Sequence, residues 1–213
     1  MKTWMINFCI LYDEADSEFI DEIKEVLRST WERVQSDFSL PADEKPIEFY
    51  LSPDVEHFIE YTGKSRETYQ DWMVGWADYG SRKICALSPR IVQDRSRQDM
   101  MKVIAHEIVH IAMDALAHED DVELWIAEGV AILYADQTER EYIDPNDFPS
   151  LNSLKDEENF ADQGGYDYAG VYVWYFIKKF GHHCFREIYH GTETAETYLY
   201  PQFEEEAVAA FLS

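Results

Sequence analysis

Two histidines four residues apart, with a glutamate directly after the first, are the residues of this chain best suited to chemistry. They are His106, Glu107 and His110 in the segment His-Glu-Ile-Val-His. Residues four apart share one face of a helix, so both imidazoles can hold one zinc ion while Glu107 reaches the water bound there. The spacing therefore predicts a metal-assisted hydrolytic site if the segment is helical. Two core-facing histidines beside a salt-bridged glutamate are the alternative reading.

Residues 98–115 have the pattern of an amphipathic helix. Apolar residues recur there at steps of three and four, and no Gly or Pro interrupts them: Met101, Ile104, Ala105, Ile108, Val109, Ala112 and Ala115. Ser96, followed three residues later by Asp99, resembles a helix start signal. The segment that carries both histidines is therefore predicted to be helical.

A third ligand is needed, because catalytic zinc usually takes three protein ligands and leaves a fourth position for water. Glu128 lies in the next predicted helix, within the segment Leu-Trp-Ile-Ala-Glu-Gly-Val-Ala. A carboxylate in so apolar a stretch is costly to bury unless it is paired or binds a metal. We expect Glu128 to be the third ligand, with an ordinary exposed Glu as the alternative and Asp114 and His118 as fallback ligands.

The motif HEIVH followed by WIAEGVA resembles the gluzincin zinc metallopeptidases, the group that includes thermolysin. The resemblance is to the branch in which HExxH is followed by W-x-x-E-G-x-A, with a thermolysin-like catalytic core. It implies Zn²⁺ as the cofactor, Glu107 as the general base, and three metal ligands: His106, His110 and Glu128. In thermolysin an acidic residue at the corresponding position steadies a zinc-bound histidine. The chain departs from that pattern, because Ile132 occupies this position. Asp114, Asp136 or a backbone carbonyl would have to replace the acidic residue.

Two further segments resemble the same branch. Residues 72–89 resemble the G-x-A-D turn and strand that precede the active-site helix, and residues 166–181 resemble the helix, led by a Tyr, that closes the site. An edge strand above the zinc binds the substrate backbone in that family by strand addition. Residues 82–88 are our candidate for this strand, and a plain structural hairpin is the alternative.

The resemblance also implies a tyrosine that stabilises the oxyanion of the reaction. Tyr168 is the first choice for this catalytic role, because it begins the last apolar helix and a phenol donates a hydrogen bond without competing as a ligand. Tyr166, His182 and His190 are the alternatives. Aromatic residues at helical spacing are more often part of the core.

The order of predicted elements indicates an α+β fold. Strands are expected at residues 5–12 and 47–51, a hairpin at 74–79 with 82–87, and helices at 17–37 and 54–61, after which the signals are helical from residue 96 onward. We expect a small N-terminal mixed β-sheet, with helices covering the HExxH helix, followed by a mainly helical C-terminal lobe. This is one domain, residues 1–213, with lobes at about 1–92 and 93–213 and a cleft between them.

Composition excludes several classes of partner. The chain has 213 residues, of which 46% are hydrophobic and 15% aromatic, and its formal net charge is -25. So acidic a protein is expected to bind neither nucleic acid nor an anionic membrane. The three cysteines, Cys9, Cys85 and Cys184, have no paired spacing and are expected to be buried thiols. The apolar N-terminus lacks a cleavage site, so a strand and a cytoplasmic location are expected.

These observations predict a zinc-dependent hydrolase that cleaves peptide or protein amide bonds, with Glu107 as the general base. A zinc amidase acting on one narrow non-peptide or single-protein substrate is a second hypothesis. A third is a binding module that has the same fold without turnover.

Overall fold

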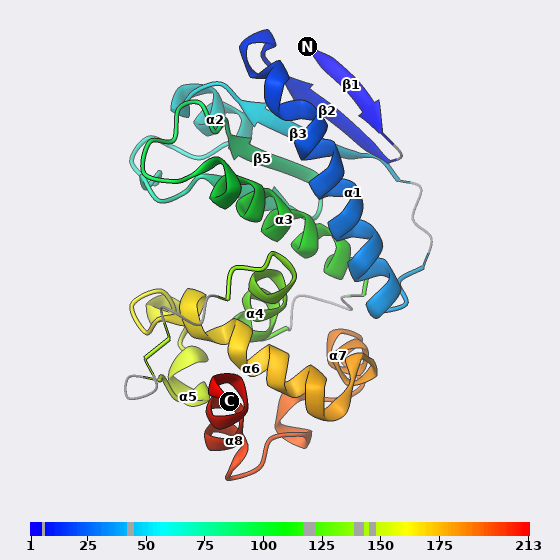
Figure 1. Ribbon diagram of the computed structural model, residues 1–213, viewed down its shortest axis with the longest axis vertical. Coiled ribbons are helices and arrows are strands. Elements are labelled where there is room, and N and C mark those ends of the chain that lie inside the picture. The colour runs from blue at the N-terminus through cyan, green and yellow to red at the C-terminus, as the bar shows by residue number, and fades with distance from the viewer. Residues whose placement is uncertain (6, 42–44, 117–121, 139–142, 145–147) are drawn as a thin grey trace. The chain divides into compact units, whose positions relative to one another are not determined.

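The computed structural model describes residues 1–5, 7–41, 45–116, 122–138, 143–144 and 148–213 (Figure 1). Within these residues the fold is α+β, as predicted, with one five-stranded mixed sheet and eight α-helices. Contacts divide the chain into two compact units, residues 1–33 with 41–111, and residues 34–40 with 112–213. The division falls after Ile111, inside the helix of the histidine motif, whereas the two lobes were expected to divide near residue 92.

The first unit contains the sheet. Its strands are β1 (Lys2–Met5), β2 (Phe8–Tyr12), β3 (Ile47–Ser52), β4 (Gly75–Asp78) and β5 (Lys83–Leu87), in the order β1-β2-β3-β5-β4. The central strands β2, β3 and β5 are parallel, and β1 and β4 pair antiparallel at the two edges. Alternate residues of β3, namely Ile47, Phe49 and Leu51, are fully buried, as the two-residue period of a strand requires.

The predicted strand at residues 5–12 is wrong in its extent. The segment forms two antiparallel strands, β1 and β2, which change direction beside Asn7. The helix expected at 17–37 also has two parts, the 3₁₀-helix η1 (Glu14–Phe19) and the α-helix α1 (Ile20–Asp37). The hairpin of β4 and β5 and the strand β3 are confirmed.

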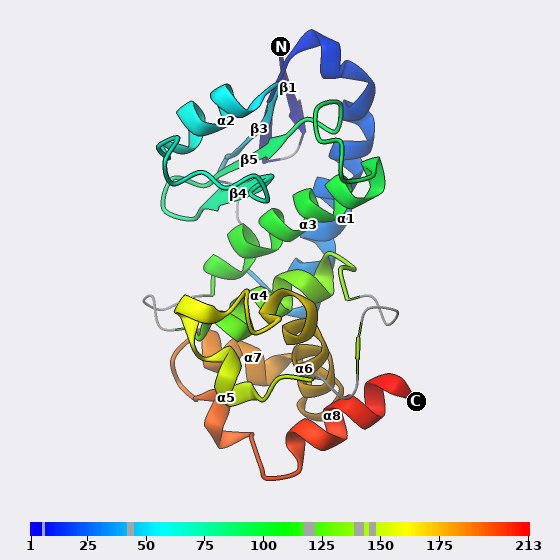
Figure 2. The same ribbon diagram turned by 90° about the vertical axis from the view of Figure 1, so that its left-hand side faces the viewer.

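Helices pack on both faces of the sheet. Trp31 of α1 meets Phe8 edge to face, with ring centroids 6.0 Å apart, and Tyr61 of α2 (Val55–Thr62) meets Tyr50, with centroids 4.8 Å apart. Figure 2 shows α1 and α2 on opposite sides of the strands. The helix predicted at residues 54–61 is confirmed, and Gly63 caps its C-terminus with a left-handed φ of 68°.

The second unit is helical. It contains α4 (Leu124–Tyr134), α5 (Leu151–Leu154), α6 (Gly165–Phe180), α7 (His182–Tyr189) and α8 (Phe203–Leu212), with the 3₁₀-helices η3 (Glu157–Asn159) and η4 (Ala195–Thr197). Helix α6 contacts α4, α7 and α8 (Figure 1). A Cβ atom at Gly129 would lie 2.5 Å from Val173 Cγ2 and 2.7 Å from the Ala169 carbonyl oxygen. Helices α4 and α6 therefore cross in close contact, which a side chain at Gly129 would prevent.

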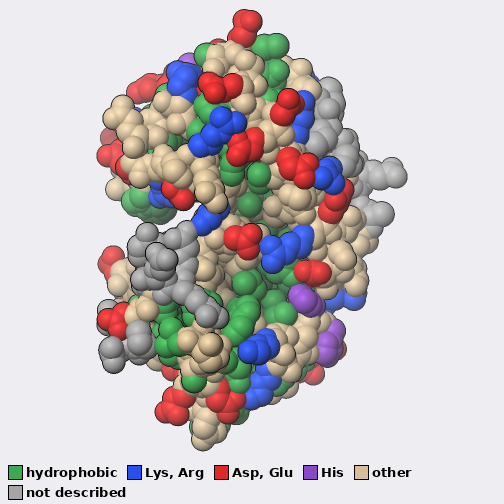
Figure 3. Space-filling model, viewed as in Figure 1, with side chains coloured by type: hydrophobic (Ala, Val, Ile, Leu, Met, Phe, Trp, Pro, Cys, Tyr) green, Lys and Arg blue, Asp and Glu red, His purple; other side chains and the backbone are tan. Residues whose placement is uncertain are grey.

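The surface carries charged side chains of both signs. On the face shown in Figure 3, acidic and basic side chains of the described residues are interspersed, and the basic ones do not gather into one patch. In the part of the chain that the structure describes, no helix has the length and apolar character needed to span a membrane. The three cysteines are buried and form no disulfide, as expected.

Candidate metal centre

One long helix carries the histidine motif. It is α3 (Arg97–Asp114), so the helix predicted for residues 98–115 is confirmed. Ser96 and Asp99 form the predicted start signal: the Asp99 carboxylate accepts from the Ser96 amide at 2.9 Å, and the Asp99 amide donates to the Ser96 hydroxyl at 3.1 Å. The hydrogen bonds from Ser96 also lower the pKa of Asp99. Ile104 and Ile108 are fully buried, which fixes the direction in which the opposite side of the helix points.

The two histidine rings of α3 face each other. Their Nε2 atoms are 3.0 Å apart, and the ring centroids are 4.7 Å apart at an interplanar angle of 73°. Tetrahedral zinc with bonds of about 2.0–2.1 Å sets two ligand nitrogens about 3.3 Å apart. The pair is therefore spaced for one shared metal ion. The same distance also suits a direct hydrogen bond between a protonated and an unprotonated imidazole nitrogen.

Glu128 completes a group of three ligand atoms. His106, His110 and Glu128 each offer one such atom, and the three lie within 4.8 Å of one another. Two atoms bound to one tetrahedral zinc ion lie about 3.3 Å apart, so the three atoms would move closer together when they bind one ion. The Oε2 atom of Glu128 is buried from solvent. A buried carboxylate oxygen beside two imidazoles fits a divalent cation by charge and by donor type.

Glu107 lies against the backbone of β4. A Cβ atom built on Gly75 would be 2.6 Å from Glu107 Oε1 and 2.6 Å from Val103 Cγ1. The absent side chain at position 75 therefore leaves the space that the Glu107 carboxylate occupies. Burial raises the pKa of the Cys85 thiol in β5, and the negative charge of the nearby Glu107 carboxylate raises it further. The sequence of residues 72–89 indicated only a likeness to the gluzincins and did not reveal this role of Gly75.

The candidate edge strand at residues 82–88 is wrong. These residues form β5, which pairs with β3 on one side and with β4 on the other, so their backbone groups are already used within the sheet. Within the described part of the chain, β4 pairs with β5 alone. The strand with an available edge on the side of Glu107 is therefore β4. The interpretation of residues 74–87 as a hairpin was correct, but strand order decides which of its arms is outermost.

Tyr168 lies in a hydrophobic cluster of the second unit. It is buried with Ile143, Val171 and Phe211, and its ring meets that of Phe148 with centroids 4.6 Å apart. Its hydroxyl accepts a hydrogen bond from the Asp144 amide at 3.3 Å. Its role as the oxyanion donor stays a prediction, and these contacts give it a structural role as well.

The three alternatives to Tyr168 as hydrogen-bond donor to the oxyanion lie in different surroundings. Tyr166 is exposed on α6, with its ring at the edge of Phe160. His182 begins α7 and meets the ring of Phe38 edge to face, with centroids 5.3 Å apart. His190 is exposed where α7 ends.

Asp114 and His118 were the fallback ligands, and Asp114 and Asp136 were the possible substitutes for the acidic residue of thermolysin. Asp114 and Asp136 are exposed, at the end of α3 and just after α4. The ligand group contains neither of them. His118 lies outside the described residues.

Tyr79 is a second residue near the site that was not predicted from the sequence. Its ring centroid lies 5.9 Å from that of His110, at an interplanar angle of 48°, and 44% of the residue is exposed. It directly follows β4, in the turn that leads to β5. The only sequence signal for it is its position after the Gly-x-Ala-Asp segment, which does not by itself place an aromatic ring beside a histidine.

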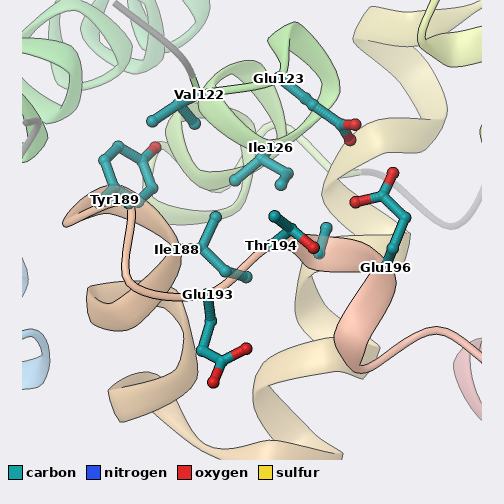
Figure 4. Close-up of a pocket in the computed structure, with 10 residues that line it drawn as sticks. Val122, Glu123, Ile126, Ile188, Tyr189, Glu193, Thr194 and Glu196 are labelled. Atoms are coloured by element: carbon teal, nitrogen blue, oxygen red, sulfur yellow. The ribbon is translucent and has the colours of Figure 1, made fainter. Parts of the chain in front are cut away.

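A separate hollow of about 240 Å³ lies within the second unit (Figure 4). Ile126 of α4 and Ile188 of α7 form apolar walls, and Glu123 and Glu196 stand at its rim. Lys155 forms ion pairs with both of these carboxylates. The charges of Glu123 and Glu196 are thus partly compensated within the chain.

Comparison of this chain with protein-family models, with curated proteins and with solved structures gave no match. The functional interpretation therefore rests on the geometry of the site and on the chemistry of its residues.

Proposed function

We propose that this protein is a zinc-dependent peptidase of the gluzincin type. The observation that carries the proposal is the approach of two imidazole nitrogens and one carboxylate oxygen to within 4.8 Å of one another, with Glu107 next to the first histidine. Two histidines and a glutamate are a ligand set of catalytic zinc, and this number of ligands leaves a position for water.

Zinc held by these three side chains would lower the pKa of its water toward neutrality and polarise a substrate carbonyl. Glu107 acts as the general base: it takes a proton from the attacking water and then delivers it to the leaving amine. Its carboxylate is confined by Gly75 on one side, which keeps it near the point where the proton is transferred.

The edge of β4 supports an extended substrate. An unpaired strand edge offers alternating amide and carbonyl groups, to which a peptide in extended conformation adds as a further strand. Because Gly75 of β4 contacts Glu107, a peptide on this edge would pass the general base. This arrangement favours a peptide or protein substrate over a small non-peptide amide.

A library of extended peptides incubated with the zinc-loaded protein tests the proposal. We expect broad cleavage by the natural chain, and a loss of about 10²- to 10⁴-fold in kcat for Glu107→Gln with bound zinc retained. Glu205→Gln, at an exposed position on α8, is the matched control and should cleave normally. Undiminished cleavage by Glu107→Gln would refute the assigned base. Zinc binding without cleavage of any peptide would favour the amidase or the binding module.

A further inference from the structure

We propose that Tyr79 is a catalytic residue whose phenol donates a hydrogen bond to the substrate carbonyl oxygen as this oxygen becomes negatively charged. The inference rests on the proposed function and adds a residue to it. Its starting point is the ring of Tyr79 beside that of His110, at a centroid distance of 5.9 Å. A side chain in contact with a metal ligand and 44% exposed can also meet a molecule bound next to that ligand.

The turn that carries Tyr79 is closed by several hydrogen bonds. The Arg82 amide donates to the Tyr79 carbonyl oxygen at 3.1 Å, and the Ser81 hydroxyl donates to Asp78 Oδ2 at 2.6 Å. The Ser81 amide also donates to Asp78 Oδ1, and together these bonds lower the pKa of the Asp78 carboxyl. The backbone of Tyr79 is therefore held in place before any substrate arrives, which is what a preorganised donor requires.

The position of Tyr79 along the chain matches the direction of the substrate. It is the first residue beyond the edge strand β4, whose first residue, Gly75, contacts the general base. An extended peptide on β4 would therefore pass both the residue that contacts Glu107 and the residue that contacts His110. The metal ligand His110 contacts Tyr79 directly, one helical turn beyond His106. The base, the ligand and the phenol thus belong to two adjoining elements, α3 and the β4–β5 hairpin.

The competing tyrosine is less suited to the task. Tyr168 is only 8% exposed, and its hydroxyl oxygen accepts a hydrogen bond from the backbone of Asp144. Its ring is surrounded by apolar neighbours in the cluster with Val171 and Phe211. A donor to the substrate must reach the reacting atoms, and Tyr168 exposes 8% of its surface where Tyr79 exposes 44%.

The test compares Tyr79→Phe with the natural chain and with Tyr69→Phe, a control whose ring packs against Phe58 in the same unit. Loss of one oxyanion donor typically costs about 10²- to 10³-fold in rate. We expect kcat of Tyr79→Phe to fall by about 10²-fold, with KM and zinc content unchanged, and Tyr69→Phe to match the natural chain.

A second readout does not depend on turnover. Cobalt in place of zinc gives a visible spectrum, and its change on addition of acetohydroxamate, an oxyanion-bearing chelator, reports the affinity for that probe. We expect Tyr79→Phe to bind acetohydroxamate about 10-fold more weakly, with an unchanged spectrum before the probe is added. Values for Tyr79→Phe within twofold of the natural chain, or a larger loss in Tyr168→Phe, would overturn the inference. The proposed function fails on different results, namely if the natural chain binds neither metal or cleaves no peptide, and neither of these results depends on Tyr79.

Discussion

Gly75 shows how one missing side chain can make room for Glu107, the proposed general base. Its Cα faces the Glu107 carboxylate so closely that a methyl group there would lie 2.6 Å from Oε1, far inside van der Waals contact. We predict that Gly75→Ala displaces the carboxylate and lowers kcat by about 10²-fold, since small misplacements of reacting groups have effects of this size. Val103 is equally close, so overpacking should also reduce the free energy of unfolding, by about 1–3 kcal/mol. Steady-state kinetics and urea denaturation measure the two effects.

Gly80→Ala is the matched control in the same hairpin. A Cβ atom at position 80 would have its nearest contact at 3.6 Å, from Asp78 Oδ1, which is an ordinary van der Waals distance. Its kcat and stability should therefore remain close to those of the natural chain. An equal loss of activity in both variants would show that the hairpin as a whole, and not the space beside Glu107, determines the rate.

At this scale, the parts of the candidate site that follow from local spacing could be predicted. His106 and His110 are brought together by the pitch of a single helix, and Glu128 was predicted because a carboxylate interrupts an apolar segment. Tyr79 and Tyr168 could not be told apart in this way. Which phenol lies near a histidine depends on packing between distant segments, and the sequence offers several tyrosines of similar character.

At the scale of the elements, the close crossing of α4 and α6 holds the backbone beside Glu128, the proposed third ligand, in position. Gly129 follows Glu128 directly, and a Cβ atom there would lie 2.7 Å from the backbone oxygen of Ala169. We predict that Gly129→Ala separates the two helices, destabilises the protein by about 1–3 kcal/mol, and weakens metal binding through Glu128. The expected gain in helix propensity, about 1 kcal/mol, acts in the opposite direction. Calorimetry shows whether the loss from overpacking or the gain in helix propensity is larger. A raised Tm in Gly129→Ala would contradict the close crossing.

The elements themselves were predictable where turn signals or periodicity were strong. Ser96 and Asp99 begin α3, and Gly63 ends α2, each through a contact that the residue type favours. The division between β1 and β2 was missed because an apolar run gives no period that would reveal a turn. The order of the strands was missed for a different reason: β5 pairs with β3 across the 30 residues, 53–82, that separate the two strands, and local sequence does not encode which arm of a hairpin makes this pairing.

For the whole molecule, the acidic composition and the proposed centre are related. A formal net charge of -25 raises the electrostatic cost of the compact state, and a bound divalent cation offsets part of it where carboxylates and imidazoles converge. Binding that is specific for the folded state adds stability according to the ratio of free metal to Kd, about 2.7 kcal/mol at a hundredfold excess. Removal of zinc by a chelator should therefore lower the Tm, and restored zinc should return it.

Elemental analysis of the zinc in protein purified without chelator decides whether His106, His110 and Glu128 hold a metal ion. We expect one zinc per natural chain, none in His110→Ala, and a strong reduction in Glu128→Gln. His183→Ala, at an exposed position on α7, should keep the natural content. Absence of zinc from the natural chain, or full zinc content in both His110→Ala and Glu128→Gln, would contradict the assignment of these residues to one metal centre.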